Sequence, residues 1–139
     1  MSNEQNKALV SKLFTEGMNK KNYAIFNEII APGFTNHGIP GAQQGPEGFR
    51  DVIAVFHSAF PDFTVRPEHI IAEGDLVATR GTATGTHNGE FMGVPASGRP
   101  VNISYVDFWR VENGKLVENW VQMDSVGIMQ QIGATPEMA

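Results

Sequence analysis

The hydrophobic residues of this chain change their spacing part-way along it. Up to Pro61 they recur every three or four positions, which is typical of helices that bury one face. Beyond Pro61 they alternate with polar residues, which is typical of strands. The first pattern predicts helices over residues 4–20, 23–30 and 46–60. The second predicts strands over residues 63–71, 76–87, 101–111 and 116–124, and a short apolar helix over 125–133 closes the pattern.

Helices that precede strands predict an α+β domain with a mostly antiparallel sheet. The strands are joined by short turns, and Asn113–Gly114 is the dipeptide typical of a tight hairpin. Three helices on one face of a curved sheet would enclose a conical cavity. The other face would remain uncovered, and we expect a homodimer or a larger homo-oligomer to bury it. The length suits a single domain over residues 1–139.

Composition and charge narrow the classes of function. The sequence has no cysteine, which excludes disulfides, thiolate metal sites and cysteine nucleophiles. The formal net charge is -5 and the basic residues are scattered, so we expect neither a nucleic-acid partner nor a membrane partner. No apolar run approaches the roughly 18 residues of a transmembrane helix, and the polar N-terminus lacks a signal-peptide core. A cytoplasmic protein is the expectation.

The last predicted strand ends in a carboxylate, Asp124, that lies between an apolar strand and an apolar helix. Alternation puts Asp124 on one face with Trp120 and Gln122, a mixture of aromatic and polar groups that suits a pocket wall. The other face carries Asn119, Val121 and neighbouring apolar residues, and is expected to be ordinary packing. Burial would raise the pKa of Asp124 and make it a usable base. The alternative is that Asp124 caps the following helix, and spacing alone slightly favours this cap.

A second carboxylate, Asp107, lies mid-strand on the same face as Tyr105 and Trp109. A carboxylate flanked by apolar residues is usually paired, and Arg80 in the preceding strand is an available partner. The interpretation that spacing favours is a structural Arg80–Asp107 pair. The functional alternative is a polar wall for a ligand that carries a carbonyl group.

The four histidines are not at metal-ligand spacing, so no metal site is expected. His37 and His87 are the better site candidates, because each lies in a glycine-containing segment beside apolar residues. The loop that follows His87 carries Phe91 and Met92, and we expect it to be a flap over the cavity.

A set of motifs spread over nearly the whole chain resembles a known family. These motifs are Asn36-His-Gly38, Gly45-Pro-Glu-Gly48, Phe60-Pro-Asp62, Glu73-Gly-Asp-Leu-Val77, Gly85-Thr-His-Asn-Gly-Glu-Phe-Met-Gly93, Val106-Asp-Phe-Trp-Arg-Val111, Asn113-Gly-Lys-Leu-Val-Glu-Asn-Trp120, Asp124 and Gln130-Gln-Ile-Gly133. As a set they are similar to the SnoaL-like polyketide cyclase (ester cyclase) family.

The resemblance implies an NTF2-like, cone-shaped α+β barrel with a deep apolar pocket for a small hydrophobic ligand. It implies ring closure by intramolecular aldol condensation without cofactor or metal. Asp124 would be the acid/base, and His37 would lie in the pocket. Asn119 stands where many relatives have a histidine, and we find no match for a second pocket histidine. The candidate substrate-binding residues are Phe60, Arg80, His87, Phe91, Met92, Tyr105, Asp107, Trp109, Trp120 and Gln122.

Three functional hypotheses remain open at this point. The first is an aldol cyclase or a related proton-transfer enzyme. The second is another cavity enzyme, such as an epoxide hydrolase or a ketosteroid-type isomerase; an epoxide hydrolase would require Arg80, Asp107 and Asp124 to converge. The third is a non-catalytic ligand-binding protein, which predicts that Asp124 caps the helix.

Overall fold

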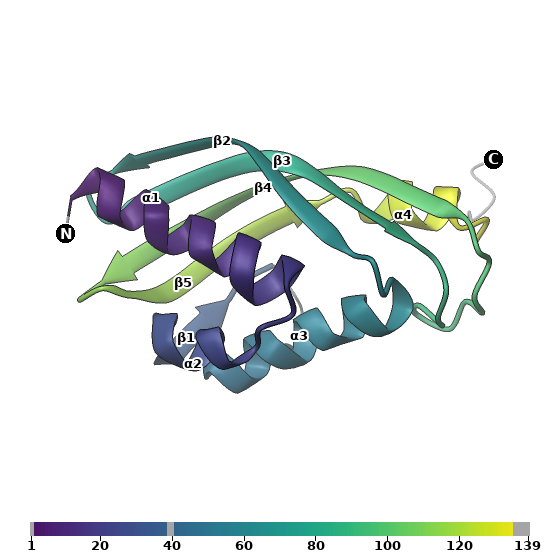
Figure 1. Ribbon diagram of the computed structural model, residues 1–139, viewed down its shortest axis with the longest axis horizontal. Helices are drawn as coiled ribbons and strands as arrows, with labels where there is room; N and C mark the ends of the chain where they lie inside the picture. Colours follow the sequence, from purple (N-terminus) through teal and green to yellow (C-terminus); the bar gives the residue numbers. More distant parts are fainter. Residues whose placement is uncertain (1, 39–40, 135–139) are drawn as a thin grey trace.

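One curved sheet is the centre of the computed structural model, which describes residues 2–38 and 41–134 (Figure 1). Its strands lie in the order β1-β5-β4-β3-β2. The first strand runs parallel to β5, and all other neighbours are antiparallel, which confirms the predicted α+β architecture. The strands are β1 (Ile30–Asn36), β2 (Thr64–Glu73), β3 (Leu76–Thr86), β4 (Pro100–Glu112) and β5 (Lys115–Met123).

The helices before β2 cover one face of this sheet, which we call the inner face (Figure 1). They are α1 (Asn3–Lys12), the π-helix η1 (Leu13–Asn19), α2 (Ala24–Ile29) and α3 (Gly45–Ala59). A capping box between Ser2 and Gln5 starts α1. Pro46 lies in the first turn of α3, as predicted. A last helix, α4 (Ser125–Gln131), follows β5 and lies apart from the others.

The core lies between the helices and the inner face. Buried and exposed residues alternate strictly along most of β4, which places Tyr105, Asp107 and Trp109 inward as predicted. Trp109 contacts three aromatic rings, stacking with Phe34 and meeting two others edge-on. Aromatic rings in these arrangements stabilise a core beyond the area that they bury.

Strand β1 was not predicted, because the sequence indicates a helix to residue 30 and an irregular segment over 34–45. It pairs with β5 at only a few positions, around a bulge between Ile30 and Thr35. Such an edge strand carries little alternation, and Pro32 is tolerated there because an edge position needs no ladder hydrogen bond. Residues 39–40 of the irregular segment lie outside the described residues.

Candidate functional site

The main cavity lies between α3, η1 and the inner face. Its free space, measured for the centre of a water-sized sphere, is about 60 Å³, which is small beside the roughly 300–1,000 Å³ of typical ligand pockets. Its walls are mostly aromatic and aliphatic, with Phe14, Met18, Phe49, Val52, Ile53 and Phe56 from the helices and Phe63, Val65, Ala83, Trp109, Val121 and Met123 from the sheet side. Its polar lining side chains are Asn36, Tyr105, Asp107 and Asn119.

Asp107 is the ionisable carboxylate of this cavity, and only 4% of it is exposed. Cross-strand register puts it beside Thr79, whose hydroxyl donates to Asp107 Oδ1. Trp109 Nε1 donates to the same oxygen at 2.9 Å. Burial raises the pKa of Asp107 to about 6, although the hydrogen bonds from Thr79 and Trp109 oppose the shift. Asp107 can therefore both hold and release a proton near neutral pH.

Two further polar groups of the cavity wall lack partners among the described residues. They are the Tyr105 hydroxyl and Asn119 Oδ1, both buried. Burial raises the pKa of Tyr105, and the nearby Asp107 carboxylate raises it further. The phenol therefore stays protonated and remains a hydrogen-bond donor. Because an unsatisfied buried polar group costs free energy, both atoms favour a polar ligand in the main cavity.

Asp124 does not line the cavity, and the prediction that it faces a pocket is wrong. Its side chain is exposed and caps α4, accepting a hydrogen bond from Gly127 N at 2.8 Å. A Cβ atom at Gly127 would lie 2.2 Å from the Asp124 carboxylate, so the cap requires the glycine. The capping alternative from the sequence is therefore the one that the structure adopts.

The predicted roles of the two faces of β5 are also reversed. Asn119, Val121 and Met123 line the cavity, whereas Trp120 and Gln122 lie on the outer face. Alternation groups these residues correctly, but both faces of the strand carry apolar side chains. The pattern alone therefore does not say which face the helices cover.

His37 lies outside the cavity, contrary to its predicted place in the pocket. Its ring stacks on Trp120 with centroids 5.2 Å apart, and its Nε2 lies 2.8 Å from Glu118 Oε2. Arg110 Nε donates to the other oxygen of Glu118 at 2.6 Å. These contacts lower the pKa of Glu118, chiefly through His37 and then Arg110. His37 therefore belongs to a polar network beside the outer face.

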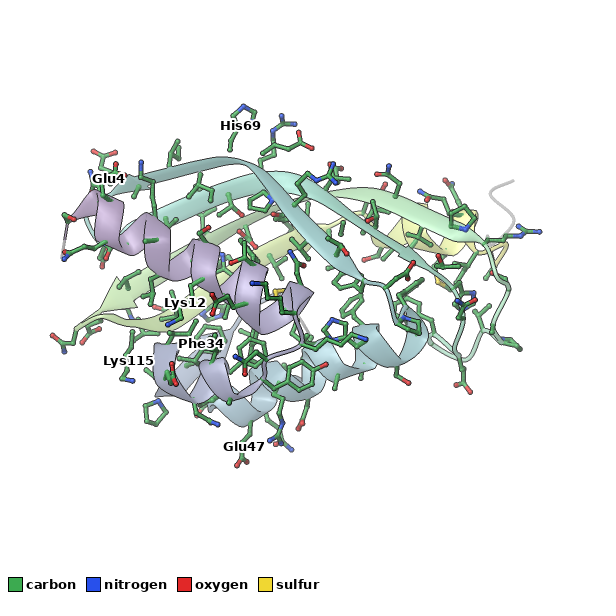
Figure 2. The ribbon with its side chains drawn as sticks, in the orientation of Figure 1. Glu4, Lys12, Phe34, Glu47, His69 and Lys115 are labelled. Atoms are coloured by element: carbon green, nitrogen blue, oxygen red, sulfur yellow. The ribbon has the colours of Figure 1, made fainter. Side chains whose placement is uncertain are left out.

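Arg80 does not pair with Asp107, because the two lie on opposite faces of the sheet. Arg80 faces outward, where it lies within 4 Å of Glu68 and hydrogen-bonds His69 Nδ1. Figure 2 shows His69 projecting from β2 on the side away from the helices. Arg80, Asp107 and Asp124 do not converge, which removes the epoxide hydrolase alternative.

The remaining predicted residues gather near the end of α3 rather than in the main cavity. Phe60 packs against both His87 and Phe91, with centroids 5.6 and 5.3 Å away. His87 is fully buried, and its Nδ1 accepts a hydrogen bond from Ser97 N at 3.1 Å. Met92 is 76% exposed. The loop predicted to be a flap therefore packs beside the main cavity and does not line it.

Sequence reasoning missed Asn36, Asn119 and Thr79 as groups in or next to the cavity. For Thr79 a signal exists, since it precedes Arg80 and so points to the opposite face of the same strand. Among the described residues, no group of three or more His, Asp or Glu side chains could hold a metal ion. No helix in that part of the chain is long and apolar enough to cross a membrane.

Comparison with known proteins identifies the family of this chain. The family model described as SnoaL-like polyketide cyclase matches residues 8–132. The chain belongs to the SnoaL-like polyketide cyclase family. No curated protein matches it in sequence.

Solved structures of similar proteins share the fold of this SnoaL-like chain over nearly its whole length. IdmH from Streptomyces antibioticus is 34% identical, with 93% of this chain and 99% of that chain covered and a TM-score of 0.82. A SnoaL-like protein from Jannaschia sp. CCS1 is 30% identical, with 96% and 95% covered and a TM-score of 0.87. TsrD from Streptomyces laurentii is 25% identical, with 96% and 98% covered and a TM-score of 0.88. The predicted NTF2-like architecture is confirmed.

Proposed function

We propose that this SnoaL-like protein catalyses cofactor-free acid/base chemistry, an intramolecular aldol ring closure, on a hydrophobic carbonyl compound in the main cavity. One observation carries the proposal: Asp107 is buried in an apolar cavity with its pKa raised to about 6. The base differs from the one that the family resemblance implies, because Asp124 is an exposed helix cap. IdmH, a proposed polyketide cyclase, supports the reaction class, whereas AclR from Streptomyces galilaeus is a proposed hydroxylase.

The residues of the cavity suit each step of such a closure. The Asp107 carboxylate takes a proton from a carbon between two carbonyls, and the electron pair of the C–H bond delocalises into an enolate. The Tyr105 hydroxyl donates a hydrogen bond to the enolate oxygen. The enolate carbon then bonds to a ketone carbon of the same molecule, and the π electrons of that ketone move to its oxygen. Asp107 returns its proton to this alkoxide, which leaves a hydroxyl group and a free carboxylate.

The apolar walls supply orientation rather than chemistry. A flexible chain held between Phe14, Phe49 and Trp109 would have few conformations left besides the one that brings its reacting carbons together. Such positioning can replace much of the entropic cost of ring closure. Burial also keeps water away from the enolate, which would otherwise be protonated at carbon.

The test compares two carboxylate variants on one substrate. The substrate is a hydrophobic 1,3-dicarbonyl compound that carries a further ketone, placed so that attack on this ketone closes a six-membered ring. Asp107→Asn preserves an oxygen that accepts from Thr79 and Trp109 but cannot carry the proton. We expect it to slow ring closure by roughly 10²- to 10⁴-fold, the usual contribution of general acid/base catalysis. Asp124→Asn, the matched control, should close the ring at the wild-type rate, measured by chromatography of the product. A wild-type rate in Asp107→Asn would refute the assignment.

A non-catalytic ligand-binding protein is the second candidate, and the helix cap at Asp124 favours it. The unpaired Tyr105 hydroxyl would donate to a ligand carbonyl, and Asn119 Oδ1 would accept from a ligand hydroxyl such as an enol, without converting the ligand. In that case the wild-type protein binds the dicarbonyl but gives no acceleration over buffer. Calorimetric titration alongside the rate measurement separates the two candidates.

We also propose that the chain forms a homodimer through the outer face of the sheet. Val106, Phe108 and Trp120, which we call the outer patch, are between 39% and 45% exposed, and Phe108 lies directly beside Trp120 in the register. Acidic and basic side chains flank the patch, with Arg110–Glu118 on β4 and β5 and Arg80–Glu68 on β3 and β2. A two-fold axis through the patch would bury its apolar centre and let these charges face their opposites.

A further inference from the structure

A second, smaller cavity lies beside the main one, and its free space, measured for the centre of a water-sized sphere, is about 10 Å³, room for one small group. We call it the rear cavity. Phe60, Val101, Ile103 and Ile128 are among its lining residues, together with Phe56 and Phe63. Ile128 comes from α4, the helix that Asp124 caps. Thr84 and Gly85 complete the lining, so the space is mostly apolar and suits a methyl-sized group.

Phe56 and Phe63 line both cavities. Their rings stack with centroids 5.2 Å apart and an angle of 24° between the planes, and both side chains are nearly buried. One ring comes from α3 and the other from the segment before β2. The pair therefore lies between the two spaces, and a ligand would have to pass it to reach from one into the other.

The inward residues of β4 line both cavities and so indicate the path along which a ligand would reach the rings of Phe56 and Phe63. Tyr105 and Asp107 line the main cavity, whereas Val101 and Ile103 line the rear one. All four point to the same face, and successive inward residues of a strand are about 7 Å apart. A ligand with its carbonyl group at Asp107 and its tail directed toward Val101 would meet the two rings within a few carbon atoms.

We propose that Phe56 and Phe63 determine specificity by setting the length of the apolar tail that the main cavity accepts. The ligand class is a hydrophobic 1,3-dicarbonyl compound with an unbranched alkyl tail. Removing one of the rings would join its volume to the rear cavity and give an extended tail room to enter. The inference rests on the proposed function only in placing the dicarbonyl group at Asp107.

The probes are alkane-2,4-diones of increasing tail length, which cannot close a ring and so remain intact during titration. Binding to the full chain is measured by calorimetry. In the wild type we expect affinity to rise by about fourfold per methylene, the value for burying one CH₂ group, and to level off when the tail reaches the rings. In Phe63→Ala the rise should continue for several more methylenes. Phe63→Leu, a milder change, should move the levelling point less far in the same direction.

Phe91→Ala is the matched control, because Phe91 packs against Phe56 and Phe60 without separating the two cavities. It removes an equal ring and should leave the levelling point where it is in the wild type. Adding Val101→Phe to Phe63→Ala should fill the rear cavity and restore the shorter limit. The proposal is rejected if affinity levels off at the same tail length in Phe63→Ala, Phe63→Leu and the wild type. It is also rejected if Phe91→Ala moves this tail length as far as Phe63→Ala does.

The outcomes also separate this inference from the proposed function. In one outcome, Phe63→Ala extends the tail length at which affinity levels off, while Asp107→Asn closes rings at the wild-type rate. This outcome would support Phe56 and Phe63 as the limit on tail length and would reject Asp107 as the catalytic base. Diones that bind neither the wild type nor any variant would reject both the partition and the proposed ligand class.

Discussion

Among single residues, Asp107 gives the sharpest prediction, because its pKa is raised from an ordinary value of 3.8 to about 6. Between these two pH values the folded protein binds more protons than the unfolded chain, so the free energy of unfolding falls as the pH rises from about 4 to about 6. The loss is at most about 3 kcal/mol, from 1.36 kcal/mol per pKa unit. Asp107→Asn has no such cost, and its stability relative to the wild type should grow over that interval. Urea unfolding at pH 4 and pH 7.5 measures the difference, and an equal difference at both would contradict the burial of the charge.

A substitution at Thr79 tests the pKa of Asp107 by removing one of its hydrogen bonds. Its hydroxyl lowers the pKa of Asp107, so Thr79→Val should raise that pKa further. We expect the rising limb of the pH–rate profile to move to higher pH, with the maximal rate reached once Asp107 is fully ionised. A profile that stays in place while the rate falls at every pH would mean that Thr79 matters for packing only.

The pairing of Asp107 shows where residue-level prediction stops. Alternation along one strand correctly placed Tyr105, Asp107 and Trp109 together. Arg80 was the predicted partner, whereas the structure pairs Asp107 with Thr79, which points to the opposite face of β3 from Arg80. The choice depends on cross-strand register, which is a property of two strands and is not written in the spacing of either one.

At the scale of elements, the junction of β5 and α4 carries the next prediction. Asp124→Ala removes the acceptor that caps α4 and should lower the free energy of unfolding by about 1 kcal/mol. Asp124→Asn keeps a capping oxygen and should be close to the wild type in stability. Both variants should retain ring closure, because the side chain lies outside the cavity. Thermal unfolding and the ring-closure assay test the two statements separately, and a loss of activity in Asp124→Asn without a loss of stability would restore the catalytic reading of Asp124.

The elements themselves were largely predictable, but two features of strand pairing, the bulge in β5 and strand β1, were not. A bulge in β5 makes Val117 an extra residue, so that Leu116 and Asn119 both face inward although they are three positions apart. Strand β1 joins that same edge through only a few pairs. Both features arise from how neighbouring strands pair, whereas burial patterns within one segment are enough to predict that it is a helix or a strand.

For the whole molecule, the sequence predicted a sheet with helices on one face only. The outer patch is exposed because it lies on the face that the helices leave uncovered. A charge at its centre would be buried without a partner in the proposed homodimer. Phe108→Glu should therefore raise the dissociation constant of the homodimer by about tenfold or more, the effect of losing a central interface residue. Val55→Glu is the control, since Val55 is 56% exposed on α3, away from the outer face, and should leave the assembly unchanged.

Sedimentation velocity over a range of concentrations measures the dissociation constant of the homodimer in both variants. The cavity lies on the other face of the sheet from the patch, so ring closure should survive in the Phe108→Glu monomer. A wild-type protein that stays monomeric at every concentration would reject the outer patch as the dimer interface.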